Sequence, residues 1–293
     1  MTTAAHLKTI TTPYGSFTID VEIDRKIANG LAAGHHQRET LELLRHFVTK
    51  QSTVVDIGAH VGTLAVPLAT WAAQAIAFEP APETYALLCR NVEQNNVVVD
   101  ARNKGLSRAS GHATLVSRDH GNAGSQTLHT GVGSLVISTL DEEVAHADVI
   151  KIDTEGMELE VLEGGSALIA RSRPVVLFEV NLSQLRAHGA SPRMLERYFA
   201  GQHYRLYVPL GAGSSLHLGS VGWLGLLTAC IAPRAWLLQS QSAPFDILAL
   251  PAELQPPLPT VSFATVLWGA VCDNFNNKIT RLKRVLRGER STT

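Results

Sequence analysis

The pattern of apolar and polar positions along this chain changes from segment to segment. It predicts strands that alternate with helices. Short apolar runs predict seven central strands, at 54–57, 75–78, 97–101, 149–152, 174–180, 204–208 and 245–250. Apolar residues at helical spacing predict helices over 62–73, 82–95 and 157–170 and one that begins at Ser191-Pro192, a favourable helix start. This alternation is typical of an α/β fold with a doubly wound, mostly parallel, seven-stranded sheet.

Four stretches lie outside the alternation. The alternating stretch 12–20 predicts a small N-terminal hairpin, 39–48 predicts a helix, and 111–116 and 134–139 predict short strands. We therefore divide the chain into an N-terminal hairpin and helix (1–50), a central domain (51–251) with an insertion (209–244), and a C-terminal tail (252–293) with a basic helix.

Composition narrows the function only slightly. The net charge of −1 over 293 residues indicates neither a nucleic-acid nor a membrane partner. Three widely spaced cysteines suggest a reducing compartment, and the first residues lack the apolar core of a signal peptide, so we expect a cytoplasmic protein. The apolar stretch 221–238 contains Pro233 and Arg234, which argues against a transmembrane segment.

Two strand ends carry the candidate chemistry. The strand 54–57 runs into Gly58-Ala59-His60-Val61-Gly62, and the strand 75–78 ends at Glu79-Pro80. Side chains at Gly58 or Gly62 would block close approach of the backbone to a ligand. A carboxylate at Glu79 can accept two hydrogen bonds from ribose hydroxyls. The G-x-x-x-G spacing, with Asp56 before it, differs from the G-x-G-x-x-G of dinucleotide sites.

Further blocks give a specific resemblance. They are 56–62, 78–82, 139–141, 150–158 (Ile-Lys-Ile-Asp-Thr-Glu-Gly-Met-Glu), 161–164 and 178–179. In this order they resemble the FkbM family of methyltransferases, over about Tyr14 to Pro251. The resemblance implies a class I, Rossmann-like methyltransferase fold. It also implies methyl transfer from S-adenosylmethionine to a hydroxyl oxygen of a secondary metabolite, sugar or glycolipid.

The resemblance implies positions for the cofactor. Asp56, Gly58 and Ala59 would shape the loop under its methionine end, and His60 and Gly62 belong to the same loop. Glu79 would bind the ribose hydroxyls, and Pro80 would rigidify the turn beside the adenine. Leu106 and Ser107 follow the third strand, where related folds touch the adenine ring. The simplest alternative for each position is an ordinary turn.

Carboxylates gather at two adjacent strand ends. Asp153, Glu155 and Glu179 are the candidate catalytic residues, because a carboxylate there could take the hydroxyl proton or stabilise the sulfonium. Glu155 and Glu158 could instead be helix N-terminal charges beside Lys151. A divalent cation is a third option, but no metal-ligand spacing favours one. His35 or His36, with Glu39 nearby, could be a base at the substrate rim or surface residues.

Several alternatives stay open. The chain could bind S-adenosylmethionine without turnover, or be a nicotinamide-dependent oxidoreductase, although the missing G-x-G-x-x-G counts against the latter. The insertion 209–244 could cover the acceptor pocket or form a homodimer contact. The basic stretch 278–290 could be a solvated helix or a peripheral membrane contact.

Overall fold

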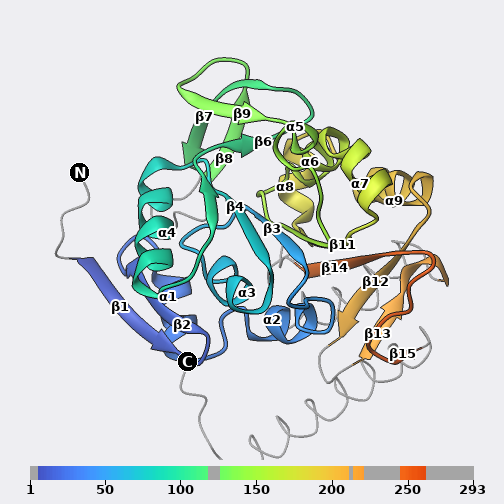
Figure 1. The fold of residues 1–293 in the computed structure, drawn as a ribbon. Coiled ribbons are helices and arrows are strands. Elements are labelled where there is room, and N and C mark those ends of the chain that lie inside the picture. The colour runs from blue at the N-terminus through green and yellow to red at the C-terminus, as the bar shows by residue number, and fades with distance from the viewer. Residues whose placement is uncertain (1–5, 118–125, 211–213, 221–244, 262–293) are drawn as a thin grey trace, which may run out of the picture.

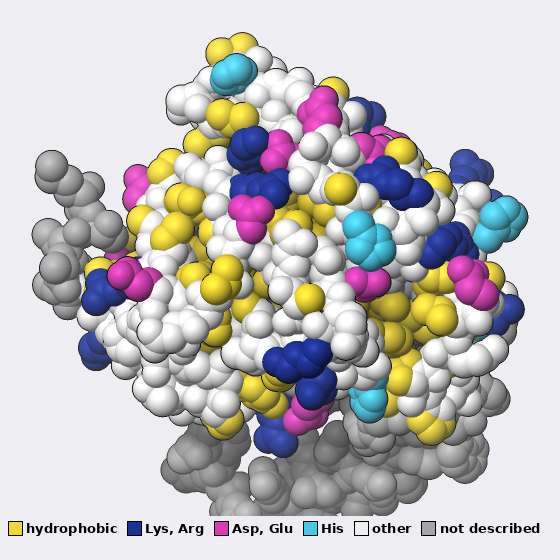
Figure 2. Space-filling view, viewed as in Figure 1, with side chains coloured by type: hydrophobic (Ala, Val, Ile, Leu, Met, Phe, Trp, Pro, Cys, Tyr) yellow, Lys and Arg dark blue, Asp and Glu magenta, His cyan; other side chains and the backbone are white. Residues whose placement is uncertain are grey.

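The computed structural model describes residues 6–117, 126–210, 214–220 and 245–261. The predicted basic helix and most of the insertion 209–244 therefore lie outside the described residues. In the described part, no helix is long and apolar enough to span a bilayer. Figure 2 shows basic and acidic side chains interspersed on one face, with no patch of a single sign.

A central sheet organises the molecule (Figure 1). In spatial order its strands are β15 (Thr260–Val261), β13 (Ser214–His217), β12 (Tyr204–Leu210), β14 (Phe245–Pro251), β11 (Val175–Val180), β10 (Val149–Ile152), β3 (Thr53–Ile57), β4 (Gln74–Phe78) and β5 (Asp100–Arg102). The neighbours from β11 to β5 pair in parallel, and β14 is antiparallel to both β11 and β12. The α/β prediction is confirmed.

The predicted number of seven strands was wrong. Six of the seven runs form strands where predicted; the run 97–99 lies outside strands, and β5 follows it at Asp100–Arg102. β13 and β15 add two more strands at one edge, so the described sheet has nine. β13 pairs with β12 and β15 pairs with β13. Part of the stretch that we assigned to an insertion therefore extends the sheet. A polar stretch such as Ser214-Ser215 gives little strand signal, because its pairing depends on a neighbour already being in place.

Helices cover both faces of this sheet. The helices are α1 (Arg25–Ala32), α2 (Arg38–Leu44), α3 (Ala65–Trp71), α4 (Pro82–Gln94), α5 (Leu140–Glu143), α6 (Glu158–Gly164), α7 (Ser166–Ser172), α8 (Leu182–Ala187) and α9 (Pro192–Gly201), with a short 3-10 turn at Leu218–Ser220. Alternate residues of β3 point to opposite faces. Val55 and Ile57 pack in the core beneath α6, α7 and α9, while Val54 packs with residues of α2 and α3.

The helix predicted over 157–170 is in fact two helices. α6 ends at Gly164 and α7 begins at Ser166. A Cβ at Gly164 would lie 2.1 Å from the carbonyl oxygen of Ser107, and one at Gly165 would lie 2.6 Å from Leu140 Cδ2. The glycine pair thus lets this turn pack closely against the neighbouring loop, which interrupts the helix.

Two smaller units flank the central sheet (Figure 1). An N-terminal antiparallel hairpin consists of β1 (Leu7–Thr12) and β2 (Gly15–Asp20). A four-stranded sheet consists, in spatial order, of β6 (Gly105–Leu106), β9 (Leu135–Ser138), β7 (Gly111–Ser117) and β8 (Gln126–Thr130). Both units contact elements that border the carboxyl ends of the parallel strands.

Side-chain amides of α4 hold the hairpin. Asn91 is fully buried, accepts from the Thr18 N–H at 2.7 Å, and donates to the Thr18 carbonyl at 3.0 Å and to the Val61 carbonyl at 2.8 Å. Gln94 and Asn95 both donate to the Ser16 carbonyl. These side-chain amides form hydrogen bonds with backbone groups at the edge of β2 that a neighbouring strand would otherwise pair with. Asn91 therefore joins the hairpin to the glycine loop that contains Val61.

Candidate active site

A cavity of about 1000 Å³ lies at the carboxyl ends of β3, β4, β10 and β11. This is the edge of an open α/β sheet where ligands bind. The cavity brings together most of the predicted site residues: Asp56, Gly58, Ala59, His60, Glu79, Pro80, Leu106, Asp153, Glu155 and Glu179. His35, His36 and Glu39 also line it. Gly62, Ser107 and Glu158 are not among its lining residues.

The loop from Gly58 to Gly62, here called the glycine loop, needs its glycines for a different steric reason from the one we predicted. Gly58 has φ +81°, and a Cβ there would lie 1.8 Å from the carbonyl oxygen of Asp153. Gly62 has φ +88°, and a Cβ there would lie 2.7 Å from Leu88 Cδ1. Both glycines are thus required by contacts within the protein. Gly58 brings the ends of β3 and β10 together, which places Asp56 and Asp153 on the same side of the cavity.

Glu79 is held at the end of β4 by backbone donors. Its Oε2 accepts from the His60 N–H and its Oε1 accepts from the Ala81 N–H, each at 2.9 Å. Glu79 is 7% exposed, and burial raises the pKa of its carboxyl group. Each oxygen keeps a second lone pair for another donor. Glu79 therefore presents a carboxylate of fixed orientation to the cavity.

His60 connects the glycine loop to the N-terminal region. Its backbone is left-handed, with φ +50°, and its Nε2 lies 3.3 Å from Oδ2 of Asp24, a buried residue just before α1. Burial alone would lower the pKa of His60, but the hydrogen bond and charge of Asp24 produce a net increase. Asp24 was not predicted as part of the site, because it is far from the loop in sequence.

Asp56 is a buried carboxylate with an unused acceptor. It is 3% exposed and lines the cavity, and its Oδ2 has no hydrogen-bond partner in the described residues. Burial raises the pKa of Asp56 to about 7, and the nearby Asp153 and Glu79 oppose its ionisation further. A buried polar atom without a partner is costly unless a ligand supplies the donor. The arrangement suits a cationic or N–H group of a bound molecule.

A buried lysine lies beneath the acidic residues. Lys151 is 2% exposed, and its Nζ lies 3.0 Å from Asp246 Oδ1 and 3.9 Å from Asp153 Oδ2. Burial would lower the pKa of Lys151, but these carboxylates and Glu179 raise it, so the ammonium stays charged. We had expected Lys151 to pair with Glu155 or Glu158; the structure pairs it with Asp246 on β14. The sequence did contain a signal for this role of Asp246, since it is the only charged residue in the apolar strand β14.

Asp153 and Glu179 act as a pair. Glu179 is hydrogen-bonded to Asp153, and burial together with the Asp153 charge raises the pKa of Glu179 well above its usual range. Two carboxyl groups in contact cannot both ionise easily, so one of them holds the proton. The pair therefore offers one carboxylate acceptor, supported by the Lys151 ammonium, and one protonated donor.

Glu155 and Glu158 differ in their surroundings. Glu155 lines the cavity with a left-handed backbone, φ +55°, and burial together with Asp153 raises its pKa to about 7. Glu158 is 2% exposed, and its Oε1 accepts from the N–H groups of Thr154 and Gly156 and from the Thr154 hydroxyl. Glu158 thus fastens the turn before α6, while Glu155 faces the cavity.

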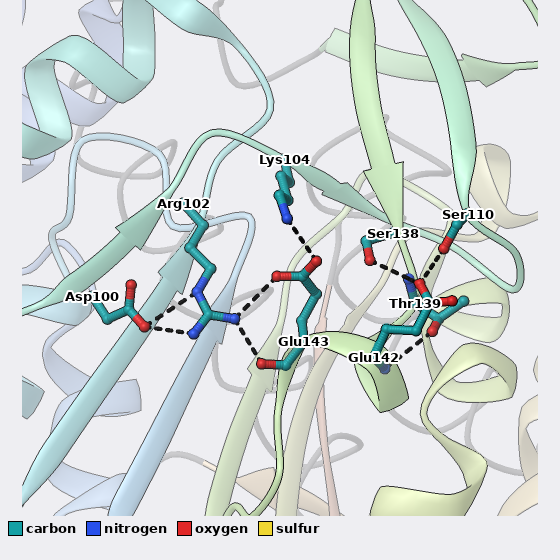
Figure 3. A network of polar contacts seen from close by, with 8 residues as sticks. All are labelled: Asp100, Arg102, Lys104, Ser110, Ser138, Thr139, Glu142 and Glu143. Atoms are coloured by element: carbon teal, nitrogen blue, oxygen red, sulfur yellow. Dashed lines mark hydrogen bonds and ion pairs between the residues drawn. The ribbon is translucent and has the colours of Figure 1, made fainter.

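The position predicted for the adenine is only partly correct. Leu106 lines the cavity, but Ser107 turns away and donates to Glu160 Oε2 at 2.6 Å. Lys104, Gly105, Leu115 and Leu128 line the cavity beside Leu106. Lys104 is tied to Glu143 at 2.7 Å within the network of Figure 3, which also joins Arg102 to Asp100 and Glu143. Leu115 and Leu128 come from the small sheet, whose contribution the local sequence does not reveal.

The described residues contain no group of three or more His, Cys, Asp or Glu side chains arranged to hold a metal ion. The cavity itself offers the fixed carboxylate of Glu79, the pair of Asp153 and Glu179 that holds one proton, and several histidines. Such a site can bind hydroxyl groups, accept a proton, and receive a cationic group at Asp56.

Comparisons with known proteins agree with this geometry. A family model described as "Methyltransferase FkbM domain" matches residues 56–206, just over half of the chain. The "Hexuronic acid methyltransferase AglP" of Haloferax volcanii is 33% identical over 135 residues, covering 44% of this chain and 56% of that protein. The chain thus spans little more than half the length of this relative.

Solved structures also match. The methyltransferase FkbM from Methylobacillus flagellatus is 17% identical and has a TM-score of 0.33, covering 45% of this chain and 33% of that one. Trm5b from Pyrococcus abyssi is 12% identical and has a TM-score of 0.44, covering 84% of this chain and 56% of that one.

Proposed function

Because the chain belongs to the FkbM methyltransferase family, we propose that it transfers the methyl group of S-adenosylmethionine to a hydroxyl oxygen of a small-molecule acceptor. The observation that carries this proposal is Glu79, a buried carboxylate at the end of β4 that faces the cavity and is oriented by two backbone N–H groups. A carboxylate so placed suits the paired hydroxyls of a ribose.

The cavity residues fit this cofactor. Asp56 offers an unpaired buried oxygen for the ammonium of the methionine part. The backbone of Gly58, Ala59 and His60 borders the same end of the cavity, and Pro80 and Leu106 offer apolar surface for the adenine. When bound, S-adenosylmethionine supplies an activated methyl group on a positively charged sulfur.

Asp153 is the proposed proton acceptor. As the carbon–oxygen bond forms and the carbon–sulfur bond breaks, the acceptor hydroxyl loses its proton to the Asp153 carboxylate. Glu179, which holds a proton of its own, orients Asp153 through their hydrogen bond, and Lys151 supports its charge. Glu155 stands beside the pair and can donate to an acceptor oxygen. Alignment of the reacting atoms supplies much of the rate in such a displacement.

A sugar is the acceptor class that we favour among secondary metabolites, sugars and glycolipids. The AglP protein is named for a hexuronic acid, and the carboxyl groups and histidines of this cavity suit an acceptor with several hydroxyls. A protein that binds the cofactor without turnover would share Glu79 and the glycine loop, so turnover must be measured directly.

Calorimetry with S-adenosylhomocysteine tests the cofactor site. We expect Glu79→Ala to weaken binding roughly tenfold or more, because up to two charge-assisted hydrogen bonds of about 1.5–3 kcal/mol each are lost. Glu83→Ala, at an exposed position in the first turn of α4, is the matched control and should bind normally. Unchanged affinity in a folded Glu79→Ala variant would contradict the assignment.

Transfer of labelled methyl from S-adenosylmethionine to a panel of sugars and other alcohols tests turnover. Label in a product supports the methyltransferase. Tight binding of S-adenosylhomocysteine without transfer to any acceptor would favour a binding protein without turnover.

A further inference from the structure

The cavity has two halves of different origin. One half comes from the ends of β3, β4, β10 and β11. The other comes from residues 26–42, which belong to α1, α2 and the turn between them and which we call the N-terminal wall. The family match begins at residue 56, so the wall lies outside the matched domain. The wall is thus the part of the cavity that the family match does not account for.

Side-chain contacts fix the wall against the other half. His36 Nε2 lies 3.4 Å from the Thr63 hydroxyl just after the glycine loop, and the Thr40 hydroxyl donates to Asp246 Oδ2 at 3.3 Å. The Asp24–His60 pair anchors the start of α1. Because Asp246 also pairs with Lys151, the wall is connected to the residues beneath Asp153. Its cavity-lining side chains therefore have defined positions relative to the proposed reaction centre.

The surface that the wall presents is polar. Ile27 is the only large apolar side chain among the wall residues that line the cavity; His35, His36, Glu39 and Thr40 are typical of the rest. Pockets for apolar ligands are lined mainly by hydrophobic and aromatic side chains. A polar wall is a poor match for a macrolide ring and a good match for a sugar with many hydroxyls.

Three cations line the cavity, and two of them are paired. Arg38 Nε lies 2.8 Å from Glu42 Oε1, and Lys104 Nζ lies 2.7 Å from Glu143 Oε1 (Figure 3). Lys26 is exposed at the cavity and forms no salt bridge within the described ranges of the chain. Its charge disfavours protonation of His36 and Glu155, although burial has the larger effect on the pKa of each. Lys26 is thus an exposed cation at the cavity that no carboxylate of the described residues neutralises.

Two of the acidic groups that line the cavity repel an anion less than ordinary carboxylates would. Burial raises the pKa of Glu155 to about 7 and that of Glu179 well above its usual range, so at neutral pH these carboxyl groups are partly or wholly protonated. Burial and the charge of His60 lower the pKa of His36 to about 4, which leaves its imidazole neutral. The acidic residues of the cavity therefore carry less negative charge than their number implies.

We propose that Lys26 is a specificity-determining residue that pairs with the carboxylate of a sugar-acid acceptor, while the acceptor hydroxyl faces Asp153. This rests on the proposed methyltransferase function and assigns its acceptor. An ammonium–carboxylate contact is a charge-assisted hydrogen bond. It discriminates between a sugar acid and the corresponding neutral sugar, because a neutral hydroxymethyl group gains far less from the cation.

Calorimetry on the full chain loaded with S-adenosylhomocysteine tests the proposal. The probes are p-nitrophenyl β-D-glucuronide and p-nitrophenyl β-D-glucoside, which differ only in the carboxylate. We expect the wild type to bind the glucuronide more tightly. Lys26→Ala should reduce that preference roughly fivefold, and Lys26→Glu should abolish it, in the range expected for a partly exposed charge pair. Arg25→Ala removes a neighbouring exposed cation that does not line the cavity and should preserve the preference.

Each outcome has one meaning. Equal binding or no binding of both glycosides by the wild type, or an unchanged preference in Lys26→Glu, overturns the sugar-acid proposal and leaves the methyltransferase function intact. Failure of the wild type to bind S-adenosylhomocysteine would contradict the proposed function itself, and that measurement is made before either glycoside is added.

Discussion

The two halves of the cavity are held in place by different means. In the half formed by the strand ends, backbone N–H groups orient Glu79: those of His60 and Ala81 both donate to its carboxylate. In the N-terminal wall, side chains make the contacts, as between Asp24 and His60 and between Thr40 and Asp246. The carboxylate of the first half is thus positioned by the backbone, whereas the wall is positioned by side chains that join distant parts of the chain.

Burial also affects the protonation of the cavity carboxyl groups. It raises the pKa of Glu79, and it raises those of Asp56 and Glu155 to about 7. Burial disfavours the charged form of a carboxyl group unless donors or cations compensate. The Asp56 Oδ2, which lines the cavity without a hydrogen-bond partner in the described residues, therefore marks a place where a ligand atom is expected.

The largest expected effect is on the methyl-transfer rate, when Asp153 of the cavity is changed. Asp153→Asn keeps the shape of the side chain and removes its charge, so we expect the methyl-transfer rate to fall roughly 10²-fold or more, as for loss of a general base. The affinity for S-adenosylhomocysteine should hardly change. Single-turnover transfer of labelled methyl and calorimetry measure the two quantities separately.

Glu179 provides the control for this variant. Removal of the Asp153 charge eases ionisation of Glu179, which could then partly replace it. The double variant Asp153→Asn/Glu179→Gln should accordingly be slower than Asp153→Asn. Full activity of Asp153→Asn, together with inactivation of the wild type by chelators, would instead indicate a metal held by other carboxylates.

An intermediate effect is expected where the hairpin meets the glycine loop. Asn91→Leu keeps the approximate volume but removes three buried hydrogen bonds, to Thr18 N–H, Thr18 O and Val61 O. At about 1 kcal/mol each, the free energy of unfolding should fall by about 3 kcal/mol. Urea denaturation measures this, with the exposed Glu93→Ala on the same helix as control. An unchanged midpoint would mean that the hairpin does not depend on Asn91.

The smallest effect concerns pH. The folded-state pKa of Glu155 is raised to about 7, above its unfolded value. Between about pH 4.5 and 7 the folded state therefore binds more protons, and this residue's contribution to stability declines as the pH rises. Relative to the wild type, Glu155→Gln should gain stability across that window, by about 1 kcal/mol after allowance for solvent screening. Urea midpoints at pH 4.5, 6 and 8 measure the difference.

The opposite sign would overturn the environment described for Glu155. A variant that is less stable than the wild type at pH 8, with no difference at pH 4.5, would mean that the ionised carboxylate is stabilised in the folded protein. The exposed Glu93→Ala variant again serves as control and should show no trend with pH.

The sequence was most informative at strand ends and least informative where segments distant in sequence meet. Six of the seven apolar runs form strands where predicted, and the blocks around Gly58, Glu79 and Asp153 meet at one cavity. Helix α1 was not predicted, because it is short and contains Asn29 and Gly30, which are poor helix formers. Ser107 was assigned to the cavity although it turns toward Glu160. Spacing along a chain indicates which elements a residue belongs to, but not which way a loop turns.

By itself, the sequence determined the alternation of strands and helices, the glycines that allow β3 to end beside β10, and the carboxylates at the ends of successive strands. These features depend on backbone preferences and on periodicities that act over a few residues. Only the tertiary structure decided that Lys151 pairs with Asp246, that His60 is held by Asp24, and that residues 26–42 close the cavity. Such contacts join residues far apart in the chain, and burial then sets their pKa values, which no local pattern encodes.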